Sequence, residues 1–91
     1  MASSFRNETI ANRTQGKFVK QFREEIEVWL KSKQRKPFAK DFDMGELVGI
    51  VVERGRNGAF QPAVETTRAQ VVIVRDSSAQ GWHILTSFPI K

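Results

Sequence analysis

The sequence contains no cysteine and only one histidine, His83, among its 91 residues. Without cysteine, the protein can form neither a disulfide framework nor a thiolate metal site. A zinc site would have to consist mainly of carboxylates, which is unusual for zinc, and the acidic residues are scattered, so we expect no metal and no other cofactor.

Long apolar runs are also absent. No stretch approaches the roughly 20 apolar residues that a membrane-spanning helix requires, and no signal-peptide pattern opens the chain. We therefore expect no membrane association and a cytosolic site of action. Signatures of a Ser-His-Asp triad, a glycine-rich phosphate loop or an HExxH metal helix are missing as well, which leaves metal-independent chemistry as the open class of reaction.

The charge is unevenly distributed. The chain has 15 Lys and Arg residues against 10 Asp and Glu, a net charge of +5 and a pI near 10.1. Residues 1–40 hold ten basic and four acidic residues, whereas residues 41–91 hold five and six. A cationic half beside a nearly neutral half indicates an anionic partner, first of all nucleic acid. The alternative is that these lysines and arginines only keep a helix surface soluble.

The length suits a single domain over residues 1–91 with a modest core. Residues 1–14 are polar, and we expect them to be frayed or to form a short helix. From residue 15 to residue 33, apolar residues recur at steps of three and four, which predicts one face of an amphipathic helix. This face comprises Phe18, Val19, Phe22, Ile26, Trp29 and Leu30.

The segment from Asp43 to Gly55 is ambiguous. Asp43 followed by Glu46 resembles a capping box, and we favour a second short helix, which makes residues 15–55 mainly helical. Against this, Gly49 and the branched residues around it also suit a buried strand. The glycines, asparagine and proline that follow predict a loop.

The last thirty residues predict an antiparallel hairpin over residues 60–90. A run rich in threonine, valine and isoleucine is followed by the breaker "DSSAQG" and then by "GWHILTSFP". Helices followed by strands indicate an α+β fold in which N-terminal helices pack on a small antiparallel sheet. With regular alternation, Trp82, Ile84, Thr86 and Phe88 share one face of the last strand, and His83, Leu85 and Ser87 share the other.

Two polar residues in this hairpin are candidates for a functional site. Arg68 lies in a strongly β-forming stretch, and its charge requires an anion, which is either an internal carboxylate such as Glu65, Glu53 or Asp76, or a phosphate. His83 can accept and donate a proton near neutral pH, although a lone histidine on a strand is often a bystander.

The final strand resembles the C-terminal signature of the barnase–EndoU–colicin–RelE nuclease superfamily. In that signature a tryptophan and apolar residues precede Thr-x-Tyr/Phe-Pro, and the matching residues here are Trp82, Thr86, Phe88 and Pro89. The resemblance implies a small ribonuclease toxin domain of the contact-dependent inhibition or bacteriocin type. It implies a domain that cuts RNA, in particular tRNA, without a metal and leaves a 2′,3′-cyclic phosphate. The implied partners are RNA, an acidic immunity protein and a translation factor, and the implied location is the cytoplasm of a target cell after secretion within a larger toxin.

The resemblance also suggests roles for residues. Thr86 orients the phosphate, Arg68 clamps it, and His83 or an uncharged lysine exchanges protons. The expected substrate-binding residues are Lys17, Lys20, Arg23, Arg54, Arg56, Trp82 and Phe88. This chain departs from many members of the superfamily in having no histidine in its helical part and a phenylalanine at position 88.

Which face of the last strand the helices cover stays open. If they cover the face of Trp82 and Thr86, Thr86 is a core hydroxyl; if they cover Leu85, Thr86 is accessible to RNA. Two alternatives to a ribonuclease also remain, namely a non-catalytic nucleic-acid-binding module and a structural or protein-binding domain.

Overall fold

The structure, a computed structural model, describes residues 2–33, 35–52 and 62–91. It is an α+β fold with two helices and two antiparallel three-stranded sheets, which confirms the predicted fold class. The helices are α1 (Glu8–Gln21) and α2 (Arg23–Lys31). The larger sheet has the order β2 (Phe38–Asp43), β5 (Arg68–Arg75), β6 (Trp82–Ile90). The smaller sheet has the order β1 (Ala2–Phe5), β3 (Gly49–Val52), β4 (Val64–Thr66).

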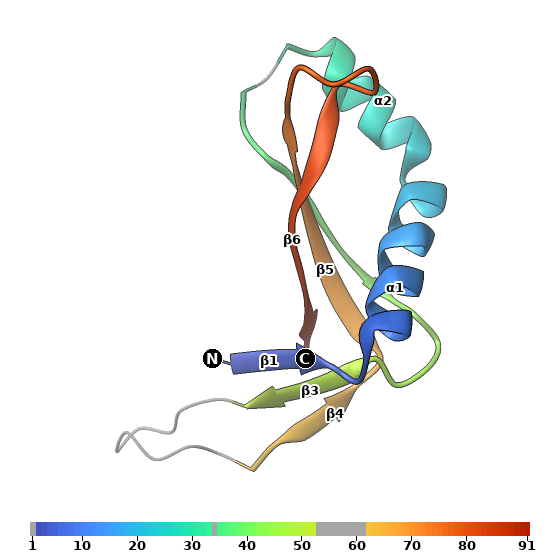
Figure 1. Ribbon diagram of the computed structural model, residues 1–91, viewed down its shortest axis with the longest axis vertical. Coiled ribbons are helices and arrows are strands. Elements are labelled where there is room, and N and C mark those ends of the chain that lie inside the picture. The colour runs from blue at the N-terminus through green and yellow to red at the C-terminus, as the bar shows by residue number, and fades with distance from the viewer. Residues whose placement is uncertain (1, 34, 53–61) are drawn as a thin grey trace.

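Both helices lie along one face of the larger sheet, and the smaller sheet lies across its lower end (Figure 1). The main core forms between the helices and that face. It contains Phe18, Phe22, Ile26 and Trp29 from the helices, Phe42 from β2, and Val71 and Ile73 from β5. The helical residues of this core are those that the three- and four-residue spacing predicts.

The helical part differs from the prediction in its limits. Asn7 caps α1 by accepting a hydrogen bond from the Ile10 amide (2.9 Å), so the helix begins well before residue 15. The helix is then interrupted at Phe22, whose backbone leaves the helical region and starts α2. Residues 2–5 form β1. Part of residues 1–14 is thus helical, as the start of α1, but fraying is wrong for residues 2–5, because β3 provides a partner strand that the local sequence does not reveal.

The predicted second helix is also wrong over the described residues 43–52, and with it the prediction that residues 15–55 are mainly helical; the predicted loop after it falls largely on residues 53–61, outside the described residues. Asp43 does accept an amide hydrogen bond, but from Gly45 (2.7 Å), in a turn where Gly45 has a φ of 75°. β3 then pairs with β1 on one side and β4 on the other. Its branched residues therefore form a central strand, and Val51 is fully buried.

The chain passes from the smaller sheet into the larger one at Thr66–Arg68. The Thr66 hydroxyl donates to the carbonyl of Ile90 (2.5 Å) and accepts from the Arg68 amide (3.1 Å). These bonds tie the end of β4, the start of β5 and the end of β6 together. They fix the two sheets to each other close to Arg68.

Candidate active site

A β-bulge in β6 decides which residues of the last strand face the helices. Val72 pairs with Thr86, but the next residue of β5, Ile73, pairs with Ile84, so Leu85 has no partner on β5. Because paired residues share a face and neighbours on a strand do not, the extra residue reverses the alternation. The prediction that Trp82, Ile84, Thr86 and Phe88 share one face is therefore wrong.

Side-chain contacts agree with this reversal. Trp82 and Ile84 pack against the main core, whereas Ser87 accepts a hydrogen bond from Gln15 of α1 (3.2 Å) and Pro89 is buried. Thr86 is exposed on the opposite side, and Leu85 is 58% exposed instead of being covered by a helix. The helices therefore face even-numbered residues, Trp82 and Ile84, before the bulge and the odd-numbered residue Ser87 after it.

The face of the larger sheet that points away from the helices is called here the open face. Its residues, in rows across β2, β5 and β6, are Asp43, Arg68 and Ile90; Asp41, Gln70 and Phe88; Ala39, Val72 and Thr86; and then Val74 and His83. Arg68 and His83, two polar residues that the sequence singles out, therefore share this face with Thr86. No helix or strand among the described residues covers it (Figure 1).

Thr86 lies between His83 and Phe88 on the open face. The partners of His83 and Thr86 on β5 are two residues apart, and so are Thr86 and Phe88 along β6. Two residues of strand correspond to about 7 Å. A hydroxyl is therefore flanked at this spacing by an imidazole on one side and by a half-buried aromatic ring on the other.

His83 is hydrogen-bonded to a carboxylate. Its Nδ1 lies 2.7 Å from Oδ2 of Asp76, while 54% of the His83 side chain stays exposed. The pKa of Asp76 is lowered, chiefly by the hydrogen bonds from the side chain and backbone of Ser78 and further by His83. Ionised Asp76 therefore stabilises the folded state at pH values above the usual carboxyl pKa. This contribution to the free energy of unfolding is lost as the pH falls through the lowered pKa of Asp76.

Arg68 lies at the far end of the open face from His83. Thr86 pairs with Val72, and Arg68 lies four residues before Val72 on β5, a distance of about 13 Å. Arg68 and Thr86 are therefore too far apart to bind the same phosphate oxygen. Its guanidinium donates to the Lys91 carbonyl (2.9 Å) and remains exposed. Asp43 is its partner on β2, an acid that the sequence did not suggest for this role.

Asp43 itself has a lowered pKa. The amide of Gly45 and the hydroxyl of Thr67 donate to it, and the charges of Lys17 and Arg68 add to the effect. The row at this end of the open face therefore contains a carboxylate and a guanidinium together. The internal ion-pair and phosphate-binding interpretations of Arg68 both stay compatible with this arrangement.

The other predicted binding residues lie elsewhere. Lys17 and Lys20 line a hollow on the flank of α1, where Lys17 donates to the Asp43 carbonyl (2.8 Å). Arg23 and Trp82 line another hollow, between the helices and β6. Trp82 is thus on the helix side and is not a neighbour of Thr86. Arg54 and Arg56 lie outside the described residues.

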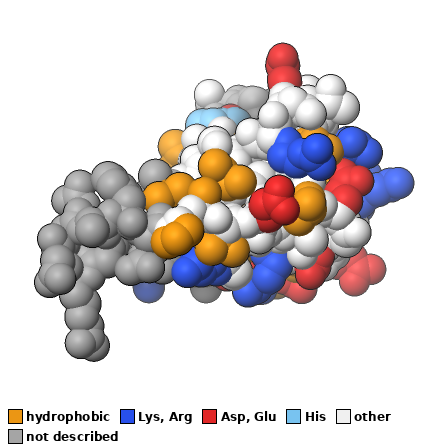
Figure 2. Space-filling model, turned by 90° about the horizontal axis from the view of Figure 1, so that it is seen from below, with side chains coloured by type: hydrophobic (Ala, Val, Ile, Leu, Met, Phe, Trp, Pro, Cys, Tyr) orange, Lys and Arg blue, Asp and Glu red, His pale blue; other side chains and the backbone are white. Residues whose placement is uncertain are grey.

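The outer face of the smaller sheet is apolar. In the view from below, hydrophobic side chains gather on it (Figure 2). Ile50 is 38% exposed, and together with Val52, Ser3 and Ser4 it lines a shallow hollow of about 190 Å³. The described residues of β1, β3 and β4 include no cation, and Glu65, the exposed partner of Ile50 on β4, repels phosphate, so this surface is not an alternative site for that chemistry.

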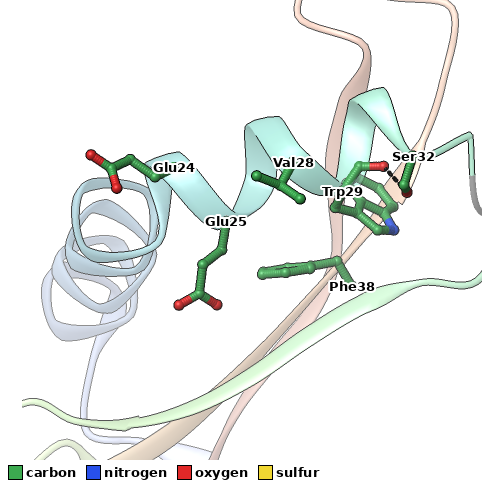
Figure 3. Close-up of a pocket in the computed structure, with 6 residues that line it drawn as sticks. All are labelled: Glu24, Glu25, Val28, Trp29, Ser32 and Phe38. Carbon is green, nitrogen blue, oxygen red and sulfur yellow. Dashed lines mark hydrogen bonds between the residues drawn. The ribbon is translucent and has the colours of Figure 1, made fainter.

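A larger hollow of about 480 Å³ lies between α2 and β2. Figure 3 shows the rings of Trp29 and Phe38 along it, with the carboxylates of Glu24 and Glu25 beside them. Glu25 is paired with Lys40 (3.0 Å). Carboxylates at its rim repel phosphate, so the hollow does not suit nucleic acid either.

Sequence reasoning named Asp76 only as a possible partner of Arg68, whereas it contacts His83, and it missed Asp41 and Asp43 as neighbours of the site. Asp76 lies in the turn before β6, seven residues from His83, and only the hairpin brings the two together. Among the described residues, no group of three or more His, Cys, Asp or Glu side chains could hold a metal ion. In the same part of the chain, no helix is both long and apolar enough to cross a membrane.

The fold and the open face define a small α+β domain that presents a hydroxyl, an imidazole and a guanidinium on one side of a sheet. Residues 1–89 match the family model of the bacterial CdiA-CT RNAse A domain. The chain belongs to this family and is a ribonuclease toxin domain of the contact-dependent inhibition type, as the C-terminal resemblance implied. The non-catalytic alternatives are thereby set aside.

One solved structure similar to this chain is the crystal structure of a CdiA-CT/CdiI complex from Y. kristensenii 33638. The two chains are 28% identical, the match covers 99% of this chain and 77% of that chain, and the TM-score is 0.87. No curated protein matches this chain.

Proposed function

We propose that this ribonuclease cleaves RNA, with tRNA as its substrate class, by attack of a ribose 2′-hydroxyl on the adjacent phosphorus. The products are a 2′,3′-cyclic phosphate and a free 5′-hydroxyl. The observation that carries the proposal is the position of Thr86 on the open face between His83 and Phe88. Because the nucleophile belongs to the substrate, the protein needs only proton transfer and stabilisation of charge on the phosphate.

Each residue of the open face has a distinct task in this proposal. The Thr86 hydroxyl donates to a non-bridging oxygen of the scissile phosphate, and His83 exchanges a proton. The ring of Phe88 stacks on a base splayed out from the RNA, as aromatic side chains do with single-stranded RNA. Arg68, about 13 Å away along the sheet, holds a neighbouring phosphate rather than the scissile one.

The main test is the nature of the products. The protein is incubated with total tRNA in EDTA, and the fragment ends are determined. Discrete fragments that end in 2′,3′-cyclic phosphate are expected, and an RNA with 2′-O-methyl groups should stay intact. Cleavage of the methylated RNA, fragments without the cyclic end, or dependence on an added metal would contradict the proposal.

The task of Arg68 can be measured by binding. A single cation that contacts a phosphate contributes about 0.7 to the slope of log affinity against log salt for single-stranded RNA. Arg68→Ala should lower the slope by about this amount and weaken binding roughly tenfold at low salt. The ligand is a 2′-O-methyl oligonucleotide, so that no cleavage occurs during titration.

Lys31→Ala is the matched control for Arg68, since it also removes one positive charge but lies in the last turn of α2 and is not an expected binding residue. Its effect on the slope should be less than half as large. Equal effects of the two substitutions would show that Arg68 contributes only to the overall field and does not contact a phosphate.

The proposed biological setting follows from the family and from the similar solved structure. The latter is a complex of CdiA-CT with CdiI. We propose a cognate immunity protein for this chain too, acidic in composition because the chain carries a net charge of +5. The proposed site of action is the cytoplasm of a target cell, after secretion within a larger toxin. Neither comparison points to a translation factor, so that expectation receives no support.

A further inference from the structure

The turn between β5 and β6 is built around Asp76. The Asp76 amide donates to the Gly81 carbonyl (3.0 Å), and the Gly81 amide donates to the Ser78 carbonyl (3.0 Å). Gly81 has a φ of 89°, a conformation that glycine adopts without a steric penalty. Oδ1 of Asp76 accepts from both the amide (2.8 Å) and the hydroxyl (2.5 Å) of Ser78. One carboxylate oxygen therefore fixes the turn.

The other oxygen of Asp76 holds the imidazole. Oδ2 lies 2.7 Å from Nδ1 of His83, and the Asp76 side chain is only 23% exposed. A carboxylate whose first oxygen is already fixed by two donors cannot rotate freely, so it sets the orientation of the ring. A carboxylate accepts a hydrogen bond from Nδ1–H and so keeps the proton on Nδ1, which leaves the lone pair of the neutral ring on Nε2.

We propose that Asp76 is a positioning residue that holds His83 with its proton on Nδ1, and that Nε2 of His83 is the general base of the cleavage. This inference rests on the proposed function. The 2′-hydroxyl proton passes to Nε2 while O2′ forms a bond to phosphorus. The bond from phosphorus to O5′ breaks, and O5′ takes a proton from water. The imidazolium then returns its extra proton to solvent.

The geometry on the open face supports this role. His83 is half-exposed and lies about 7 Å along the strand from Thr86, a span that one nucleotide bridges. With Thr86 at the phosphate, the 2′-oxygen of the same nucleotide can reach Nε2. The Asp76 carboxylate is then placed to stabilise the positive charge that develops on the imidazole during proton transfer.

The test compares three variants in the intact chain. His83→Ala should lower kcat at least about 100-fold, the range in which a general base contributes. Asp76→Asn keeps an oxygen that can accept from Ser78 but no longer requires the proton to be on Nδ1. It should lower kcat at least about tenfold and change KM by less than about twofold. Ser77→Ala is the control, an exposed residue of the same turn, and should keep activity within about twofold.

A spectroscopic measurement separates positioning from a structural role. Nitrogen NMR of labelled protein should show the Nδ1–H tautomer of neutral His83 in the wild type and a mixture of tautomers in Asp76→Asn. A uridine 3′-phosphate ester with a nitrophenolate leaving group provides a further arm. Because such a leaving group needs no proton, a general acid would become dispensable on this substrate, whereas His83→Ala should stay impaired about 100-fold if His83 is the base.

Several results would overturn the inference. They are near-wild-type cleavage by His83→Ala, an unchanged tautomer in Asp76→Asn, and recovery of His83→Ala on the nitrophenyl ester. If the wild type forms cyclic phosphate but the variants give any of these three results, the inference fails and the proposed function stands. If the wild type forms no cyclic phosphate, both fail.

Discussion

Thr86→Ala should lower kcat for RNA cleavage about 100-fold, or roughly 2.7 kcal/mol of transition-state stabilisation. The reason is that, in the proposed mechanism, its hydroxyl on the open face donates to the phosphate on which negative charge develops. KM for RNA should change little, because the proposal assigns substrate binding to Phe88 and Arg68, which this variant keeps. Steady-state kinetics with a fluorogenic RNA oligonucleotide measure both constants.

Two neighbouring substitutions make this test specific. Thr86→Ser keeps the hydroxyl and should retain activity within about fivefold. Ser87→Ala removes a hydroxyl one residue further along, but Ser87 faces α1 and bonds with Gln15, so cleavage should stay within about threefold of the wild type. If Ser87→Ala is the more damaging substitution, the β-bulge does not orient the strand as described.

Gly49→Ala should destabilise the fold by about 3 kcal/mol, because a methyl group at this position has no room. A Cβ atom there would overlap the backbone oxygen of Ser4 and lie 2.8 Å from Cγ of Pro89. The backbone of β1 and the buried ring of Pro89 cannot both move away without disturbing the contact between the two sheets. For a domain of this size the melting temperature should fall by roughly 12–24 °C, as measured by circular dichroism.

Gly16→Ala is the matched control with the opposite sign. Gly16 lies in α1, and a Cβ there would meet no atom within 4 Å. Alanine should therefore stabilise the helix by about 0.5–1 kcal/mol. A Gly49→Ala variant as stable as the wild type would mean that β1 and β3 do not approach each other as closely as the structure has them.

The elements that could be predicted from the sequence are those whose buried residues recur with the spacing of a helix or a strand within the element itself. Phe18, Phe22, Ile26 and Trp29 recur at helical steps because one side of both helices packs on the larger sheet. The hairpin of β5 and β6 was also predictable, since a branched run on each side of a polar turn leaves few other pairings. The C-terminal motif then led to the ribonuclease toxin family that the comparisons confirm.

β3 was missed because its pairing partners are remote. Gly49–Val52 has both helical and strand character locally, and what decides between them is hydrogen bonding to β1, more than forty residues earlier, and to β4. Such partners leave no mark in the segment itself. The capping-box pattern at Asp43 was misleading for the same reason, since Glu46 pairs with Arg13 of α1 (3.4 Å) instead of completing a cap.

By itself, the sequence determined the amphipathic helical face, the C-terminal hairpin, the cationic N-terminal half and the motif of the last strand. Only the tertiary structure decided that Thr86, Phe88 and His83 share one open face and that Trp82 belongs to the core. The physical reason is the single unpaired residue at Leu85, which reverses the alternation of side chains within β6. Strand periodicity predicts faces only while the register is regular, and register depends on the partner strand.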